Sequence, residues 1–218
     1  MNKPINLPNI RNITVSGRIG SGATTLAKKL SSILGWRHIE GGEVFWEALK
    51  TRMGLEEKDT DKRPDNEDQD FDASLKKILE KSRNIILETK LAGFNAQGIK
   101  GVFKIGVVCE DEKGQDQTEI RIDRLMNREK VSAAKAKADT LEREKNDLEK
   151  WRRMYVNNDQ NWVYWDRKYY DLVINTYSHN QEETLKIALK KIGCFETKST
   201  IMRHVGKLHD KYNKKKSI

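Results

Sequence analysis

The sequence predicts a three-layer α/β fold in which a five-stranded parallel sheet is flanked by helices on both faces. Short apolar or β-branched runs alternate along the chain with segments of helical spacing, and two of these runs are continuously apolar. Continuously apolar runs are typical of parallel strands buried on both faces. A glycine-rich turn joins the first expected strand to the first expected helix. Strands and helices that alternate in this way build one covered parallel sheet.

The most informative turn lies between the first expected strand, residues 12–16, and the first expected helix, residues 24–34. Gly17 and Gly22 are five positions apart, and Thr24 follows the second of them closely. This arrangement is typical of a phosphate-binding loop, in which backbone N–H groups and the positive end of the helix hold phosphate oxygens. A hydroxyl after the last glycine can ligate Mg²⁺. The predicted nucleotide-binding residues are Gly17, Arg18, Ile19, Gly20, Ser21, Gly22, Ala23, Thr24 and Thr25.

One position departs from the usual loop pattern. In G-x-x-x-x-G-K-[ST] a lysine precedes the hydroxyl and reaches the outer phosphates, whereas this chain has Ala23 there. The glycine spacing therefore indicates nucleotide binding, and the missing lysine leaves open how the outer phosphates are neutralised. An ordinary glycine-rich turn is the alternative interpretation.

The next stretch is expected to contain a short strand and two helices. Residues 36–39 predict the strand, and residues 43–53 predict a helix because apolar residues recur there at helical spacing. Residues 56–72 are acidic and contain a proline, so we expect a loop or short helices over the site. Apolar residues from Phe71 onward mark the second helix, which we expect to end at Lys81.

Three further strands and a closing helix complete the predicted domain. Residues 84–88 and 102–108 are the continuously apolar runs, and residues 170–175 predict the fifth strand. Residues 181–192 have the spacing of an amphipathic helix, which Gly193 is expected to end.

Residues 119–157 form one long charged region, for which we expect helical structure and which we call the lid segment. Its apolar positions are few, so a helix there cannot be buried along its whole length. Two interpretations remain, a coiled-coil arm and a helical lid that packs fully only when ligand is bound. Because apolar residues are too sparse for sustained heptads, we favour the lid. The lid segment carries Arg121, Arg124, Arg128 and Arg143.

Composition indicates a cytoplasmic protein without membrane contact. No apolar run approaches the ~20 residues that a membrane helix requires, and the first residues lack the apolar core of a signal peptide. Cys109 and Cys194 lie far apart and match no metal-binding spacing. Buried thiols in a reducing compartment explain them better than a disulfide does.

The two ends of the chain differ from the expected domain, residues 13–192. Residues 1–12 contain two prolines and predict an irregular lead-in. Residues 193–218 carry seven Lys or Arg against two acidic residues, a large share of the net charge of +9. Such a basic tail can contact nucleic acid or an acidic surface, but a solvated chain end is the favoured interpretation. We expect a monomer.

Five segments occur in a characteristic order along residues 13–192. They are Ile13-Thr14-Val15-Ser16-Gly17 with Gly20-Ser21-Gly22-Ala23-Thr24-Thr25-Leu26-Ala27; His38-Ile39-Glu40-Gly41-Gly42-Glu43-Val44-Phe45; Ile86-Leu87-Glu88-Thr89-Lys90-Leu91-Ala92-Gly93-Phe94; Glu119-Ile120-Arg121-Ile122-Asp123-Arg124-Leu125 with Arg128-Glu129, Arg143-Glu144 and Trp151; and Tyr170-Asp171-Leu172-Val173-Ile174-Asn175-Thr176. Together they resemble the cytidylate kinases, especially the archaeal type, among the P-loop nucleoside-monophosphate kinases. The second, third and last segments are similar to that family's I-S-A-G-D-x-F, L-E-G-R-L-A-G-W and Y-D-L-V-I-N-T.

The resemblance implies a P-loop kinase fold and Mg²⁺-dependent transfer of a phosphoryl group from ATP to CMP or dCMP, with small nucleotides as partners. Catalysis of this reaction consists mainly of holding two polyanions in line and neutralising charge. The candidate catalytic residues are Arg121, Arg124, Arg128 and Arg143; the candidate acceptor-binding residues are Glu43, Arg52, Lys90 and Gly93; the candidate Mg²⁺ ligands are Thr24 and Glu88. Ordinary helix charges paired with neighbouring carboxylates are the alternative for at least two of the arginines, and an N-cap or a salt bridge is the alternative for Glu88.

Three departures from the family pattern fall on functional positions. Ala23 replaces the loop lysine, Trp46 replaces an arginine expected to grip the acceptor phosphate, and Lys90 replaces a second arginine. Lysine keeps the charge but loses the bidentate fork of arginine. A second hypothesis is therefore a nucleotide-binding protein of the same fold with weak or no kinase activity, and a third is nucleic-acid binding through the tail. The intact lid arginines favour the kinase.

Overall fold

The computed structural model describes residues 3–56, 59 and 62–194, and within them it contains a five-stranded parallel sheet. The strand order is β2-β3-β1-β4-β5, with every neighbouring pair parallel. This confirms the predicted sheet. The strands are β1 (Asn12–Gly17), β2 (Arg37–Glu40), β3 (Ile85–Glu88), β4 (Val102–Val108) and β5 (Leu172–Asn175).

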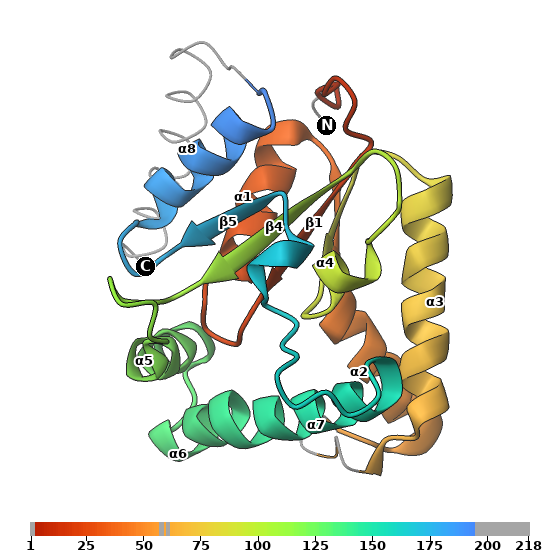
Figure 1. Ribbon diagram of the computed structural model, residues 1–218, viewed down its shortest axis with the longest axis vertical. Coiled ribbons are helices and arrows are strands. Elements are labelled where there is room, and N and C mark those ends of the chain that lie inside the picture. Colours follow the sequence, from red (N-terminus) through yellow and green to blue (C-terminus); the bar gives the residue numbers. More distant parts are fainter. Residues whose placement is uncertain (1–2, 57–58, 60–61, 195–218) are drawn as a thin grey trace, which may run out of the picture.

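Helices connect the strands and cover both faces of the sheet (Figure 1). They are α1 (Ala23–Leu34), α2 (Gly41–Met53), α3 (Asp65–Lys81), α4 (Ala92–Asn95), α5 (Thr118–Glu129), α6 (Ala133–Lys137), α7 (Arg143–Tyr155) and α8 (Gln181–Lys191), with a π-helical turn η2 (Ala138–Glu142) and a 3-10 turn η3 (Arg167–Tyr169). The three layers that the sequence predicts are therefore present.

Side-chain alternation along the strands explains the two cores. Ile13 and Val15 of β1 point to one face, where they pack with α1 and α8 around Leu26, Leu30 and Leu189. Ile85 and Leu87 of β3 belong to the opposite core, which includes Leu75 and Leu79 of α3. Successive side chains of a strand point to opposite faces, so a short apolar strand supplies both cores at once.

Helix α3 begins at Asp65, several residues earlier than predicted, so residues 65–72 belong to one long helix and not to the expected loop or short helices. Pro64 precedes the helix in an extended conformation, and Asp65, Glu67 and Asp68 occupy the first turn. Carboxylates there are favourable because they face the positive end of the helix dipole. The acidic composition that indicated a loop is the N-terminus of a helix.

The lid segment consists of several short helices that fold back across the carboxyl edge of the sheet, at the bottom of the view in Figure 1. Lys130 has a left-handed conformation, φ 54°, and ends α5. Ile122, Leu125 and Ala136 pack on Ile19 of the phosphate loop. This packing on the domain contradicts the coiled-coil arm and agrees with the favoured interpretation.

Tyr170 packs tightly against the sheet next to β5. A Cβ atom on Gly93 would lie 2.2 Å from the Tyr170 ring, and one on Gly106 would lie 2.8 Å from it. The Tyr170 hydroxyl donates to the carbonyl oxygen of Tyr164 at 2.6 Å. The two glycines therefore make the space that the ring occupies.

Two compositional expectations can be compared with the fold. Cys109 and Cys194 are both buried, and they form no disulfide with each other, as predicted. Among the described residues, none of the helices combines the length and the apolar character needed to cross a bilayer. Residues 195–218 of the basic tail lie outside the described residues.

Candidate active site

A cavity of about 950 Å³ opens at the carboxyl ends of β1 and β3. Ligands of open α/β sheets bind at this edge, outside the carboxyl ends of the strands. Its walls come from the phosphate loop, the first half of α2, the end of β3 and the lid segment. The site residues that line it are Gly17, Arg18, Ile19, Gly20, Gly22, Ala23, Thr24, Glu43, Glu88, Lys90, Arg128 and Arg143.

The phosphate loop has the backbone conformation that its glycines allow. Gly20 and Gly22 have φ of 79° and 103°, values that side chains rarely tolerate. A Cβ atom on Gly20 would lie 2.3 Å from the carbonyl oxygen of Arg121. Gly22 is the N-cap of α1, and no side chain of the described residues caps that end. The first N–H groups of α1 are thus available to an anion.

The two predicted Mg²⁺ ligands, Thr24 and Glu88, are in contact. The Thr24 hydroxyl donates to Oε1 of Glu88 at 2.5 Å, and Oε2 of Glu88 lies 3.0 Å from Nε2 of His38. A hydroxyl and a carboxylate are hard oxygen donors of the kind that Mg²⁺ prefers. The residues present therefore fit a Mg²⁺ site beside the phosphate loop.

Ala23 lies in the cavity wall, and a cation from the lid segment reaches the same region. Nη1 of Arg128 lies 3.5 Å from Oγ1 of Thr24, and the Arg128 side chain is 45% exposed. Its other contact is with Glu129, at 2.5 Å. Arg128 thus lies beside the hydroxyl that follows Ala23 and lines the same cavity.

Two of the other lid arginines face protein groups rather than the cavity. Arg121 is fully buried and pairs with Asp116 at 2.9 Å, and it donates to the carbonyl oxygen of Ile19 at 2.7 Å. Arg124 donates to the Thr176 hydroxyl at 2.8 Å and to its carbonyl oxygen at 2.9 Å. Among the described residues lining the cavity, neither arginine appears. Both brace the frame around the phosphate loop.

Arg18 of the loop is also held by carboxylates. Its guanidinium pairs with Glu144 at 2.5 Å and with Asp116 at 3.0 Å, and it lies 4.3 Å from the centre of the Trp165 ring. Burial alone would lower the pKa of Arg18, but Glu144 and Asp116 outweigh burial and raise it. Arg18 therefore stays charged and joins the loop to the lid segment.

A buried ion network lies beside the part of the cavity that Lys90 lines. Lys90 pairs with Asp147 at 2.6 Å, and Arg63 lies 3.4 Å from the same carboxylate. Burial would raise the pKa of Asp147, yet Lys90, Arg143 and Arg63 outweigh it and lower that pKa. Burial also lowers the pKa of Lys90, against the pull of Asp147. Lys90 therefore lines the cavity while its ammonium group is paired with Asp147.

Trp46 occupies the position where an arginine was expected. The ring is buried, and the guanidinium carbons of Arg63 and Arg143 lie 5.0 and 5.7 Å from its centre. Cations over an aromatic face are attracted by its quadrupole. Trp46 therefore holds two arginines in place, one of which lines the cavity.

The remaining predicted acceptor residues are dispersed. Glu43 lines the cavity, whereas Arg52 pairs with Glu67 at 2.6 Å on the exposed side of α2. The Gly93 N–H donates to the Ser16 hydroxyl at 2.9 Å, away from the cavity lining. Sequence reasoning did not propose His38 and Glu40 as site residues. Their spacing of two along one strand, beside Glu88 on the next, was the signal for them.

The fold and the glycine loop define a P-loop kinase, and comparison with known proteins agrees. A gluconokinase from Sinorhizobium meliloti shares the fold with a TM-score of 0.53 and 13% identity, covering 87% of this chain and 94% of that one. A shikimate kinase from Bacteroides thetaiotaomicron gives a TM-score of 0.51 and 11% identity, covering 83% of this chain and 97% of that one. A family model described as an AAA domain matches residues 16–142.

Sequence relatives place the chain more closely. A cytidylate kinase from Natronomonas pharaonis is 35% identical over 167 residues, which cover 75% of this chain and 80% of the relative. A cytidylate kinase from Methanosarcina acetivorans is 35% identical over 178 residues, 80% of this chain and 92% of the relative. The chain belongs to the cytidylate kinase-like family of P-loop kinases.

Proposed function

We propose that the protein transfers a phosphoryl group from ATP to a nucleoside monophosphate, CMP or dCMP, in a Mg²⁺-dependent reaction. The observation that carries this proposal is the meeting of the phosphate loop, the Thr24–Glu88 contact and Arg128 in one cavity. The names of the archaeal relatives support the choice of acceptor.

The chain's own residues supply positioning and charge. Backbone N–H groups of the loop and of the first turn of α1 bind the donor phosphates. Thr24 and Glu88 hold the Mg²⁺ ion, which neutralises charge on the transferred group when it is bound. Arg128 and Arg143 approach the cavity from the lid segment and add positive charge from the opposite side.

The acceptor nucleotide is expected to lie between the first half of α2 and the end of β3. Lys90 provides a cation there, Glu43 provides a hydrogen-bond acceptor, and the Trp46 ring forms part of the wall. Closure of the lid segment over both nucleotides would exclude water, which otherwise competes as the acceptor. Arg121 and Arg124 support this closure indirectly, because Arg121 binds the phosphate loop at Ile19 and Arg124 binds Thr176.

Weak or absent kinase activity in a nucleotide-binding protein is the second candidate. It is favoured by Ala23 in the loop and by the engagement of Arg121 and Arg124 with protein groups. Binding to backbone donors and the helix dipole does not require the lysine, so nucleotide affinity would survive without turnover.

A coupled ADP-release assay distinguishes the two. ATP and Mg²⁺ would be supplied with AMP, CMP, dCMP, UMP or GMP, and a sample without acceptor measures hydrolysis alone. Kinase activity predicts the fastest release with CMP or dCMP. Calorimetric binding of ATP with no acceptor-dependent ADP release would support the second candidate, and absence of both would reject the proposed site.

A further inference from the structure

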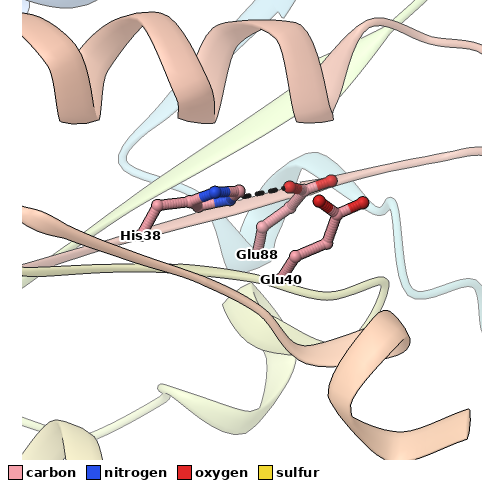
Figure 2. A group of neighbouring side chains, drawn as sticks. All are labelled: His38, Glu40 and Glu88. Atoms are coloured by element: carbon pink, nitrogen blue, oxygen red, sulfur yellow. Dashed lines mark hydrogen bonds and ion pairs between the residues drawn. The ribbon is translucent and has the colours of Figure 1, made fainter. Parts of the chain in front are cut away.

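We propose that His38, Glu40 and Glu88 form a binding site for a divalent transition-metal ion such as Zn²⁺, separate from the Mg²⁺ that accompanies a nucleotide. One nitrogen of His38 and one carboxylate oxygen from each glutamate all lie within 4.8 Å of one another. Figure 2 shows the three side chains extending to the same side of neighbouring strands, with the His38 ring directed at the Glu88 carboxylate.

Strand geometry brings the three ligands together. His38 and Glu40 are two residues apart on β2, so their side chains point to the same face of the sheet. β2 pairs with β3 in parallel, and Glu40 is the register partner of Glu88. The site therefore rests on two paired strands rather than on a loop, and rigid elements position ligands well.

Small side-chain rotations would complete the coordination. Zn²⁺ binds imidazole nitrogen and carboxylate oxygen at about 2.0–2.2 Å, so two ligand atoms on one tetrahedral ion lie about 3.4 Å apart. The three ligand atoms lie within 4.8 Å of one another, so a pair must approach by at most about 1.4 Å. The strands need not move for the side chains to converge.

The donor set selects the type of ion. Mg²⁺ and Ca²⁺ take oxygen ligands, whereas an imidazole together with carboxylates suits Zn²⁺ and its neighbours in the transition series. The three side chains are largely buried, with exposed fractions of 14%, 30% and 11% for His38, Glu40 and Glu88. Two carboxylates in a partly dry site attract a divalent cation strongly.

Glu88 connects this site to the phosphate loop without merging the two. Its Oε1 atom faces the Thr24 hydroxyl, and its Oε2 atom faces His38. One carboxylate can thus serve an ion on each side. The inference needs no bound nucleotide and does not depend on phosphoryl transfer.

Lys28 is the competitor for the site. Its Nζ atom lies 2.9 Å from Oε2 of Glu40, and its side chain is 60% exposed. An exposed pair of this kind contributes little to stability, so an arriving ion would displace it. Removing the ammonium group should therefore strengthen metal binding.

The experiment is Zn²⁺ titration of the nucleotide-free full chain against a chromophoric chelator. His38→Gln and Glu40→Gln should each weaken Zn²⁺ binding about tenfold or more, since each removes a ligand. Lys28→Met should tighten it roughly two- to fivefold, the value of the lost competing pair. Excess Mg²⁺ should compete poorly.

Control variants remove the other histidines. His179→Gln, and the double change His204→Gln with His209→Gln, should leave the Zn²⁺ affinity unchanged. Thermal melting without metal confirms that each variant is folded. If His38→Gln binds Zn²⁺ as tightly as the parent, or if the double change abolishes binding, the proposed site is wrong. A failed ADP-release assay with intact Zn²⁺ binding would reject the kinase function alone.

Discussion

At the residue scale, Ala23 leaves the phosphate loop without its lysine, so another residue must supply positive charge beside the outer phosphates of a bound nucleotide. The side chains that approach this part of the cavity include Arg128, whose guanidinium lies 3.5 Å from the Thr24 hydroxyl. A cation from the lid segment arrives only when the lid segment is in place. A lysine in the loop would be present from the start. In the proposed kinase, the substitution would therefore couple charge neutralisation to closure.

Arg128→Ala should reduce kcat about 100-fold, because removing one donor aimed at developing charge has effects of this order. Ala23→Lys should raise the turnover of the parent about tenfold, equivalent to about 1.4 kcal/mol of barrier. It should also restore part of the activity lost in Arg128→Ala. The measurement is kcat for ADP release in the two single variants and the double variant.

Lys145→Ala is the matched control, because Lys145 is a 73% exposed cation of the lid segment that pairs with Glu149. It should turn over like the parent. Equal rates for Arg128→Ala and Lys145→Ala would show that Arg128 does not carry the missing charge.

Gly20 is the residue at which the backbone leaves no room for a side chain. Gly20→Ala combines a positive φ of 79° with a Cβ atom 2.3 Å from a backbone oxygen of α5. Strain of this kind costs about 1–3 kcal/mol, so the free energy of unfolding should fall by that amount. Urea unfolding measures it.

Gly42→Ala provides the comparison, because a Cβ atom there meets nothing within 4 Å and the residue lies in α2. Its stability should be unchanged or higher by up to about 1 kcal/mol. Equal losses in both variants would contradict the assigned contact between Gly20 and α5.

At the scale of elements, the lid segment is attached to the domain largely by charges. Asp147 of α7 contacts Lys90 and Arg63, and Glu144 contacts Arg18 and Arg121. Breaking a buried pair by removing one partner is more damaging than removing both, because an uncompensated charge remains. The attachment can therefore be tested with single and double variants.

Asp147→Asn should lower the free energy of unfolding by about 3 kcal/mol, since Lys90 and Arg63 would lose their shared carboxylate. Adding Lys90→Met should recover part of the loss. Urea unfolding of the parent, both single variants and the double variant gives the coupling free energy. Additive losses would mean that the pair is not coupled.

The same pair predicts a pH dependence. The pKa of Asp147 is lower in the folded protein than the usual unfolded value of about 3.9. Its contribution is therefore complete above about pH 4 and is lost as the pH falls through the folded pKa. The stability difference between the parent and Asp147→Asn should shrink over that acidic range and stay constant near neutrality.

Elements show which parts of this structure a sequence can predict. The strands β3 and β4 are mostly apolar, and their observed bounds differ little from the predicted ones. The lid segment was predicted as helical, but its break at Lys130 was not, because a left-handed lysine carries no compositional signal. The predicted bounds of α3 were too short, because the acidic residues of its first turn were interpreted as part of a loop or short helices.

The candidate site divides in the same way. The phosphate loop could be predicted because strand, glycines and hydroxyls are contiguous in sequence. The contacts of Arg121 with Ile19 and of Arg124 with Thr176 could not, because these partners are distant in sequence. Asp116, the other partner of Arg121, is only five residues away and was accessible to sequence reasoning. Asp147 was missed because its partners Lys90 and Arg63 are distant in sequence.

At the scale of the whole molecule, the lid segment is attached less firmly than the central sheet on which it packs. The strands and α1 form the apolar core, whereas the lid segment has two small apolar clusters, one with Leu125 and Ala136 and one with Trp151, and is otherwise attached by charges. Regions with few buried apolar contacts open more readily than the core. Bound phosphates would stabilise the closed arrangement by population shift.

Hydrogen exchange should therefore be fast over residues 130–145 in the free protein and slow when ATP and CMP are both present. Exchange over residues 12–34 should slow with ATP alone, because the loop belongs to the rigid sheet. Mass spectrometry of the exchanged peptides measures both. Protection of the lid segment that rises with protein concentration and ignores nucleotide would contradict a ligand-driven lid.

The packing of Tyr170 limits which substitutions this sequence can accept during evolution. Alanine at Gly93 or Gly106 alone would meet the Tyr170 ring, and a smaller residue at 170 alone would leave a void beside both glycines. Each single step is therefore unfavourable, although a combined change could be neutral. The three positions form an epistatic unit: chains that keep both glycines should keep the aromatic ring, and chains that have lost one should have lost the other partners too.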